Sequence, residues 1–175
     1  MRRNDLNLKN MKSAEKNLNN ISKIVVSVGV GKMRQQNAQF EEKVLPDVIS
    51  ELAAIVGQRP AIRKAKKSVA GFKVRQNEVV GLVATLRGKR KKDFFVKLSE
   101  TVLPRVRDFR GVPETKVDGG GNLNIGFKDQ FVFPETVPEF SKVTFGLEVT
   151  IVTDQMNREE AIDFFKEKGI PLVTV

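Results

Sequence analysis

Positive charge is concentrated in one stretch of the chain, from Arg59 to Lys92. Its 34 residues contain twelve Lys or Arg side chains and one acid, Glu78, which is a local net charge of +11. The whole chain of 175 residues carries +10, so the remainder is close to neutral. Such a block repels itself unless a polyanion neutralises it, and the candidates are nucleic acid, an anionic membrane surface or an acidic protein. We interpret it as a binding surface rather than as a solvated charged face.

The chain contains neither histidine nor cysteine. These two absences exclude a Ser-His-Asp triad, a Cys-His nucleophile, a zinc site of the Cys/His type and a disulfide framework. An enzyme would have to work with carboxylates, lysines, arginines and hydroxyls. We therefore expect no catalytic activity, no cofactor, no metal and no small-molecule substrate, and we keep a carboxylate-based phosphotransferase as one alternative.

The segment VGVGKM, residues 28–33, invites comparison with a phosphate-binding loop, because it follows an expected strand and precedes an expected helix. The phosphate-binding loop needs a first glycine where this chain has Val26, and a Ser or Thr where it has Met33. We interpret the segment as a turn.

Length and composition favour one globular domain in the cytoplasm. A chain of 175 residues is long enough to bury about 70% of its unfolded surface. No apolar run approaches the roughly 20 residues that span a bilayer, and no apolar stretch follows the initial MRRN as in a secretory signal. We expect residues 21–175 to form a single domain after an Asn-rich arm, residues 1–20, that is flexible or ordered by a partner.

Apolar periodicity predicts an α+β fold, in which an antiparallel sheet carries helices mainly on one face. The expected strands are Ile21–Val30, Ala61–Lys66, Val79–Arg87, Leu123–Phe127 and Val143–Thr153, with a short extended piece at Phe131 and Phe133. The expected helices are Ala38–Val56, Lys89–Val102 and a last one capped by Asn157. Pro46 predicts a kink or restart, Pro104 a stop, and Gly57 a C-terminal cap.

The expected strand Val79–Arg87 would place functional groups on one face of the sheet. Leu82, Ala84 and Leu86 fall on the face that packs against helices, so Thr85 and Arg87 fall on the outward face. Hydroxyl and guanidinium groups beside a basic loop, residues 67–77, suit contacts to RNA sugars and phosphates. Lys64, Lys66, Lys67, Lys73 and Arg75 are the expected phosphate contacts.

Several strings occur in the order found in one family: KIVVSVGVGK, GQRPAIRKAKKSVAGFKVRQNE, VATLRGKR, LPRVRDFRGV, the GGGN…IGFKDQ…FPE run and VTIVT before the final helix. This pattern resembles bacterial large-subunit ribosomal protein five, the family that binds 5S ribosomal RNA. The likeness covers about Ser22 to Pro171, and AKKSVAGFK and LPRVRDFRG are long, specific strings.

The resemblance implies a ribosome-bound structural protein of the central protuberance. Members hold 5S rRNA against the large-subunit rRNA, contact P-site tRNA through the loop that matches residues 67–77, and help to bridge to small-subunit ribosomal protein thirteen. The RNA-binding residues are then expected to be Ser27, Gln58, Arg63, Lys64, Lys66, Lys67, Ser68, Thr85 and Arg87. The tRNA-contacting residues would be Ala70, Gly71, Phe72, Lys73, Val74, Arg75 and Gln76. The inter-subunit bridge would use Arg107, Asp108, Phe109, Arg110 and Gly111.

This chain departs from the family pattern at two places. Ser27 stands where members usually carry Asn, and serine keeps one donor and acceptor with a shorter reach. Members also begin with a fuller N-terminal helix than the Asn-rich arm of this chain.

Two further alternatives follow from the charge pattern. A free-standing RNA chaperone would bind many RNAs with similar affinity. Membrane binding is less favoured, because the basic block has the pattern of strands and a loop rather than of one amphipathic helix.

Overall fold

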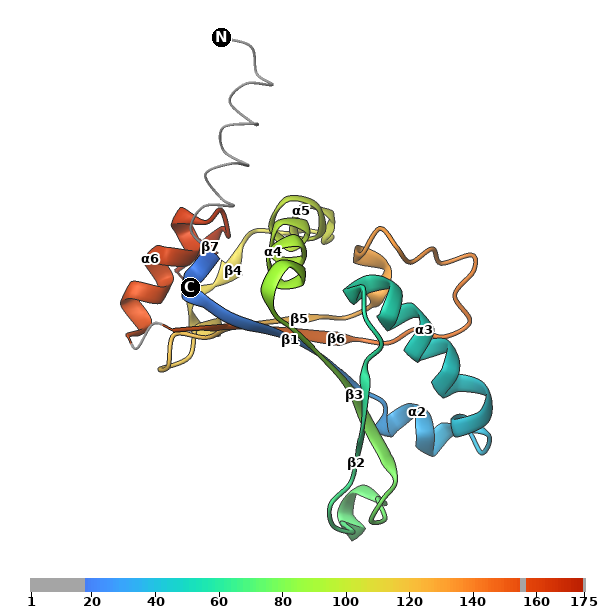
Figure 1. Ribbon diagram of the computed structural model, residues 1–175. Helices are drawn as coiled ribbons and strands as arrows, with labels where there is room; N and C mark the ends of the chain where they lie inside the picture. The colour runs from blue at the N-terminus through green and yellow to red at the C-terminus, as the bar shows by residue number, and fades with distance from the viewer. Residues whose placement is uncertain (1–17, 155–156, 175) are drawn as a thin grey trace. The chain divides into compact units, whose positions relative to one another are not determined.

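The computed structural model describes residues 18–154 and 157–174. It is an α+β fold with a five-stranded antiparallel sheet (Figure 1). The strands are β1 (Ile21–Gly29), β2 (Ala61–Lys64), β3 (Val79–Leu86), β5 (Leu123–Phe127) and β6 (Leu147–Thr153), in the order β2-β3-β1-β6-β5. The predicted fold class is therefore confirmed.

Each of the four longer strands buries alternate residues. In β1 the buried residues include Ile24, Val26 and Val28, and the residues between them are half-buried. In β3 the predicted face is buried, and Val83 and Thr85 on the other face are only half-buried. Since successive side chains point to opposite sides of a sheet, this pattern gives each strand one core face and one more open face.

Contacts divide the described chain into two compact units. Unit 1 comprises the described residues up to Ile24, the segment Arg87–Ile125 and the segment that begins at Thr150. Unit 2 comprises Val25–Leu86 and Gly126–Val149. The single domain over residues 21–175 stays a prediction.

The helices of unit 2 follow β1. A short helix, α2 (Gly31–Gln36), begins inside the segment 28–33 that was predicted as a turn, so that prediction was wrong for the second half of the segment. A π-helical turn, Phe40–Val44, then leads into α3 (Leu45–Val56). The restart expected at Pro46 is confirmed, because this proline lies in the first turn of α3, where a helix does not need its missing N–H.

The predicted apolar stripe of α3 lies in the core. Leu45, Val48, Leu52 and Ile55 are all buried. The helix ends at Gly57, as predicted, with a left-handed φ of 71° and its N–H bonded to the Ala53 carbonyl oxygen at 2.9 Å.

The helices of unit 1 are α4 (Gly88–Lys97), α5 (Leu103–Arg105) and α6 (Arg158–Glu167). A π-helical turn, Leu98–Val102, joins α4 to α5. Pro104 was expected to stop this run, but it lies in the first turn of α5, which ends one residue later. The helix α6 begins after Asn157 as predicted, although the Asn157 amide contacts the Glu160 carboxylate at 3.3 Å rather than the backbone.

Short elements complete unit 1. Strands β4 (Val112–Pro113) and β7 (Leu172–Val173) form a parallel pair that the periodicity did not predict, because two residues are too few to alternate. Leu18–Asn20 form a 3-10 turn in which Leu18 is buried. The rest of the expected N-terminal arm, residues 1–17, lies outside the described residues.

One strand prediction in this part of the chain was wrong, and a second was wrong only at its start. The extended piece expected at Phe131 and Phe133 is a 3-10 turn, Gln130–Val132. The strand expected from Val143 begins only at Leu147. The side chain of Gln130, fully buried, accepts a hydrogen bond from the Phe145 N–H at 2.9 Å and donates to the Val143 carbonyl oxygen at 2.6 Å. The backbone groups of Val143 and Phe145 that would have paired with a neighbouring strand are therefore bonded to this side chain instead.

Gln130 also ties this segment to α3. Its amide donates to the Glu51 carboxylate at 3.0 Å, and Ser141 Oγ donates to the same carboxylate at 2.6 Å. Every polar group of the Gln130 side chain is thus satisfied within unit 2, as burial of an amide requires.

We predict that Gln130→Leu lowers the free energy of unfolding by about 2–4 kcal/mol. The change leaves the buried Phe145 N–H unpaired, which alone costs about 1–3 kcal/mol, and removes the bond to a charged acceptor. Urea unfolding followed by circular dichroism measures the loss. The matched control is Gln36→Leu at an exposed position of α2, expected to change stability by under about 0.5 kcal/mol. Equal effects of the two changes would contradict the role given to Gln130.

Candidate nucleic-acid interface

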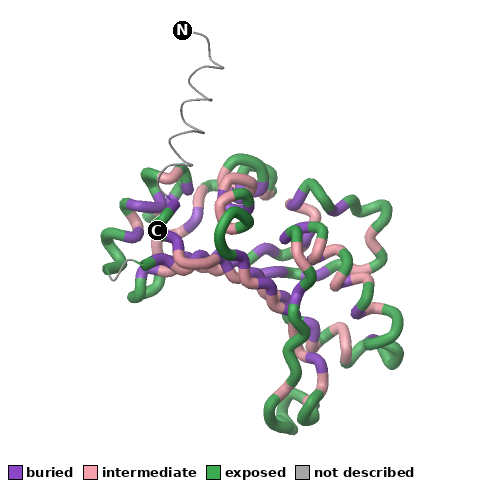
Figure 2. The backbone as a smooth tube through the Cα atoms, viewed as in Figure 1, coloured by how far each residue is buried: buried purple, intermediate pink, exposed green. Residues whose placement is uncertain are grey.

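Seven of the twelve basic residues of the block lie on or beside a hairpin of strands β2 and β3 in unit 2 (Figure 1), and the other five, between Arg87 and Lys92, belong to unit 1. The two strands pair in antiparallel register from Ala61 opposite Val83 to Lys64 opposite Val79, with an irregularity between Arg63 and Lys64. All four residues of β2 are exposed, so this strand offers two basic side chains to solvent. Figure 2 shows the exposed connection at the end of the hairpin.

The connecting loop is folded by its own backbone. Val69 and Val74 exchange two hydrogen bonds, of 2.8 and 3.2 Å, around a 3-10 turn at Ala70–Phe72. Ser68 Oγ accepts a bond from the Gln76 N–H at 2.9 Å. Lys73 adopts a left-handed conformation with φ 50°, which turns the chain back. The loop predicted to contact tRNA therefore has a defined shape.

The only acid of the block, Glu78, fastens the loop to α2. Its carboxylate pairs with the Arg34 guanidinium and accepts a hydrogen bond from the Arg75 N–H. The Arg75 N–H, and then Arg34, hold the pKa of Glu78 below its usual value. Gln35 Nε2 adds a bond to the Phe72 carbonyl oxygen at 2.6 Å. We call these contacts between α2, Glu78 and the loop the α2 clasp.

The α2 clasp was missed by sequence reasoning. The one acid in a basic block was visible, but its partner Arg34 lies on α2, a helix that was not predicted. A lone acid among twelve basic residues was the available signal, because it is the only group there that can pair with a cation.

The outward face predicted around Thr85 is partly assembled in unit 2. Gln58 follows the Gly57 cap of α3 and donates from Nε2 to the Thr85 carbonyl oxygen at 3.1 Å. Ser27 lies on the half-buried face of β1, which neighbours β3 in the sheet. Buried residues of neighbouring strands share one core, so Ser27 and Thr85 lie on the same open face.

Arg87 begins the middle segment of unit 1 directly after β3. It is exposed, extended at φ −135°, and precedes the first residue of α4. One cation of the block is engaged within this unit, because the Lys91 ammonium donates a hydrogen bond to the Ile21 carbonyl oxygen.

The remaining predicted RNA contacts lie on the hairpin. The exposed residues are Arg63, Lys64, Lys66, Lys67, Ser68, Ala70, Gly71, Phe72, Lys73, Arg75 and Gln76, whereas Val74 is half-buried. The structure thus brings the hairpin residues together in unit 2.

The predicted bridge loop lies in unit 1, between α5 and β4. Arg107, Asp108 and Arg110 are exposed, and Phe109 is half-buried. Gly111 has a φ of 117°, and a Cβ there would lie 2.6 Å from Val173 Cγ1. Glycine is therefore required, and the loop is held against β7 by the bond from the Val112 N–H to the Pro171 carbonyl oxygen at 2.8 Å.

An ion pair between Asp108 and a neighbouring arginine could also have held this loop, but the described part of the structure shows none. No described basic residue forms an ion pair with Asp108.

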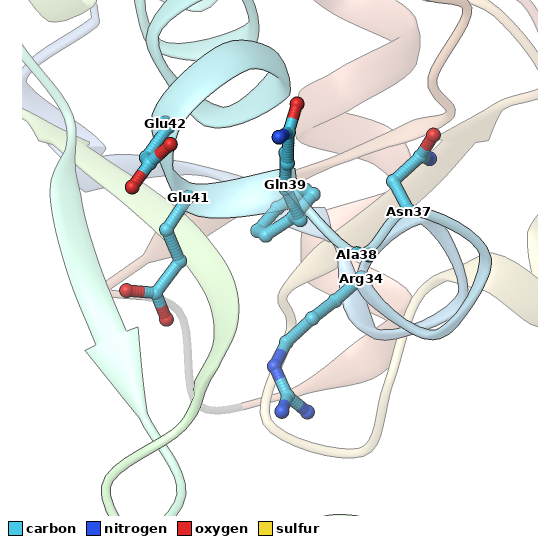
Figure 3. Close-up of a pocket in the computed structure, with 7 residues that line it drawn as sticks. Arg34, Asn37, Ala38, Gln39, Glu41 and Glu42 are labelled. Atoms are coloured by element: carbon cyan, nitrogen blue, oxygen red, sulfur yellow. The ribbon is translucent and has the colours of Figure 1, made fainter.

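A pocket of about 560 Å³ lies beside α2 in unit 2 (Figure 3). Its lining comes from α2 and from the segment that leads into α3. The lining residues are Arg34, Asn37, Ala38, Gln39, Phe40, Glu41 and Glu42. Arg34 is paired with Glu78, and the two glutamates carry the same sign of charge as a phosphate. The pocket is thus unsuited to an anionic ligand.

No helix within residues 18–154 and 157–174 is both long and apolar enough to cross a membrane.

Comparison with known proteins agrees with this architecture. The family model described as Ribosomal protein L5 matches residues 18–75, and the model for the C-terminus of the same ribosomal family matches residues 79–172. The large ribosomal subunit protein uL5 of Chloroflexus aggregans is 46% identical over 149 residues, which is 85% of this chain and 80% of that protein. The uL5 of Halothermothrix orenii is 42% identical over 86% of this chain and 82% of its own length. The uL5c of Gracilaria tenuistipitata is 43% identical over 90% and 87%.

An antiparallel α+β fold with an exposed basic hairpin, matched along most of its length by such relatives, is that of a ribosomal protein of the large subunit. The chain belongs to the ribosomal protein L5 family. It is a structural constituent of the large ribosomal subunit, associated with rRNA and bound to the ribosome in the cytoplasm. It is not an enzyme.

We predict that the Arg75 amide signal of the free protein titrates with a midpoint below pH 4.5, the ordinary value for a glutamate. A lowered pKa in the folded state means that the Glu78 contacts stabilise the fold above this pH and are lost as the pH falls through the lowered pKa. Nuclear magnetic resonance spectra of the labelled protein measure the shift. In Glu78→Gln the Arg75 titration should vanish, since no carboxylate remains at that position.

The matched control is the Gly120 amide, which donates to Asp118 at 2.9 Å. The Asn122 side chain, and then the Asn122 N–H, lower the pKa of Asp118. The Gly120 signal should titrate alike in both proteins. An unchanged Arg75 titration in Glu78→Gln would show that another group holds the loop.

Proposed function

We propose that this protein binds 5S rRNA and attaches it to the large-subunit rRNA in the central protuberance. It also contacts P-site tRNA and helps to bridge to small-subunit ribosomal protein thirteen. The family supports a place in the large subunit, and the charge on the hairpin supports a direct role in holding RNA. Residues 21–175 act in this as one RNA-binding domain.

The observation that carries the proposal is the uncompensated charge of the hairpin. Its only acid, Glu78, is already paired with Arg34, which lies outside the basic block. Lys66, Lys67 and Lys73 are exposed and have no acid beside them in the block. Phosphate oxygens are the natural partners of such side chains, because binding them releases the counterions of the nucleic acid.

Binding then has two components. The lysines and arginines of the hairpin attract RNA over long distances, and each neutralised phosphate contributes about −0.7 to −0.9 to the slope of log K against log salt concentration. The open face with Ser27 and Thr85, together with Gln58 and Arg87, contacts RNA at short range and supplies specificity for a particular shape.

The other contacts use separate loops. The hairpin loop Ala70–Gln76 contacts the tRNA, and its backbone bonds fix the shape that it presents. The loop Arg107–Gly111 contributes to the inter-subunit bridge, and its exposed arginines and Asp108 offer polar contacts to a protein partner.

The direct test titrates the purified protein with 5S rRNA and with an unrelated structured RNA of equal length, at two salt concentrations. We expect a preference for 5S rRNA that persists at the higher salt concentration, because the open face contributes contacts that do not depend on counterion release. Equal affinities that fall in parallel would contradict the proposal. They would support an RNA chaperone that binds through charge alone.

We predict that Arg87→Ala weakens binding to 5S rRNA at fixed salt by about 1–3 kcal/mol, the cost of losing a charged hydrogen bond at an interface. Filter binding or gel-shift titration measures the change. Arg110→Ala is the matched control, because Arg110 is also exposed but lies in the bridge loop. A change of under about twofold in Arg87→Ala, or an equal loss in both variants, would place the RNA face elsewhere.

A further inference from the structure

The chain has twelve phenylalanines and no tyrosine, tryptophan or histidine, so phenylalanine supplies every aromatic ring. All twelve lie within the described residues, and ten are buried or half-buried. The two exposed ones are Phe72, at 73% exposure, and Phe140, at 83%. Rings as exposed as these contribute little to the core, so most of each ring surface is accessible to a partner.

The surroundings of the two exposed rings differ in charge. Phe72 lies in the hairpin loop, where Lys73 and Arg75 follow it along the chain and are exposed. Phe140 follows Glu139, Glu135 lies five residues before it, and the nearby Lys142 is paired with Asp47 at 3.5 Å. Aromatic rings among cations suit RNA, since a nucleobase can stack on the ring while its phosphates meet the charges. Carboxylates beside a ring would repel the same phosphates.

Phe72 is also held in place before any partner arrives. Its N–H donates to the Val69 carbonyl oxygen at 3.2 Å, and its own carbonyl oxygen accepts from Gln35 at 2.6 Å. The next residue, Lys73, is fixed in a left-handed turn. The backbone N–H and carbonyl group of Phe72 are therefore both fixed by hydrogen bonds. This order lowers the conformational entropy that the loop would lose on binding.

We propose that Phe72 is a stacking platform for a nucleobase of the RNA that the hairpin loop binds. The base that it takes is one whose face is exposed, in a loop or at the end of a helix, because bases inside an A-form helix are already stacked. The contact is tolerant of base identity, since every base has a π-face. This inference rests on the proposed function, because it requires the loop to contact RNA.

The chain offers a direct optical test, because it contains no tryptophan or tyrosine. Phe72→Trp places one fluorophore at the proposed platform, and Phe140→Trp places one at the other exposed ring. Each protein is titrated with deacylated tRNA and with 5S rRNA, and binding is followed in parallel by gel shift. We expect Trp fluorescence in Phe72→Trp to be quenched along the binding curve of at least one RNA, and that of Phe140→Trp to stay unchanged.

The outcomes separate this inference from the proposed function. RNA binding without any quenching in Phe72→Trp overturns the stacking contact and leaves the proposed function standing. Equal quenching in both variants also overturns it, since the effect would not be specific to the loop. Failure of both RNAs to bind would overturn the proposed function and the inference together.

A second measurement distinguishes stacking from charge. Phe72→Ala should weaken binding of the quenching RNA about 5- to 150-fold, the effect of losing one stacked base, without changing the salt slope. Lys67→Ala, an exposed neighbour in the same block, should instead reduce the magnitude of the slope by about 0.7–0.9. An altered slope in Phe72→Ala, or no loss of affinity, would contradict the stacking contact.

Discussion

The central constraint on this protein is the need to hold many like charges on one hairpin in a fixed shape. Two unit charges at about 4 Å repel by about 1 kcal/mol in water, and a net hydrogen bond contributes about 0.5–1.5 kcal/mol. A loop with only lysines and arginines would therefore tend to open. The backbone bonds between Val69 and Val74 and the carboxylate of Glu78 oppose that repulsion. Glu78 is effective because its two oxygens reach two different elements, the loop backbone and α2.

The same alternation of residues produces both the core and the open face. In β3 the buried Leu82, Ala84 and Leu86 require that the intervening side chains point away from the core. The packing of these neighbours therefore places Thr85 on the open face. Gln58 reaches the Thr85 carbonyl oxygen because α3 ends at Gly57, whose left-handed conformation redirects the chain. Core packing and helix capping thus position the groups that we propose to contact RNA.

Most of the fold could be predicted from periodicity, because β1, β3 and β5 alternate regularly and each was predicted close to its observed bounds. Val143 and Phe145 continue the apolar alternation of β6, but the Gln130 side chain forms hydrogen bonds with the Val143 carbonyl oxygen and the Phe145 N–H. A contact between residues so far apart in the sequence leaves no local pattern from which it could be predicted. None of the residues of α2 is buried, so this helix has no apolar stripe to detect. The basic block of the candidate site was visible because charge is a local property, whereas Arg34 and Glu78 meet only after α2 forms. The long strings such as AKKSVAGFK indicated the family, which the family models and relatives confirm.

Charge alone cannot explain how such a protein would choose its RNA, because every structured RNA offers phosphates at similar density. Counterion release strengthens binding to all of them, and it weakens as salt rises. Selectivity must therefore come from neutral groups that are held in fixed positions, where a misfit leaves polar groups unpaired. In this chain, without histidine, tyrosine or tryptophan, the neutral groups available to contact bases and sugars are amides, hydroxyls, backbone and phenylalanine. Gln58, Thr85 and Phe72 all have a backbone fixed by the fold of unit 2. A short set of rigid neutral groups beside a large positive charge is sufficient for the two requirements, fast capture and a specific fit.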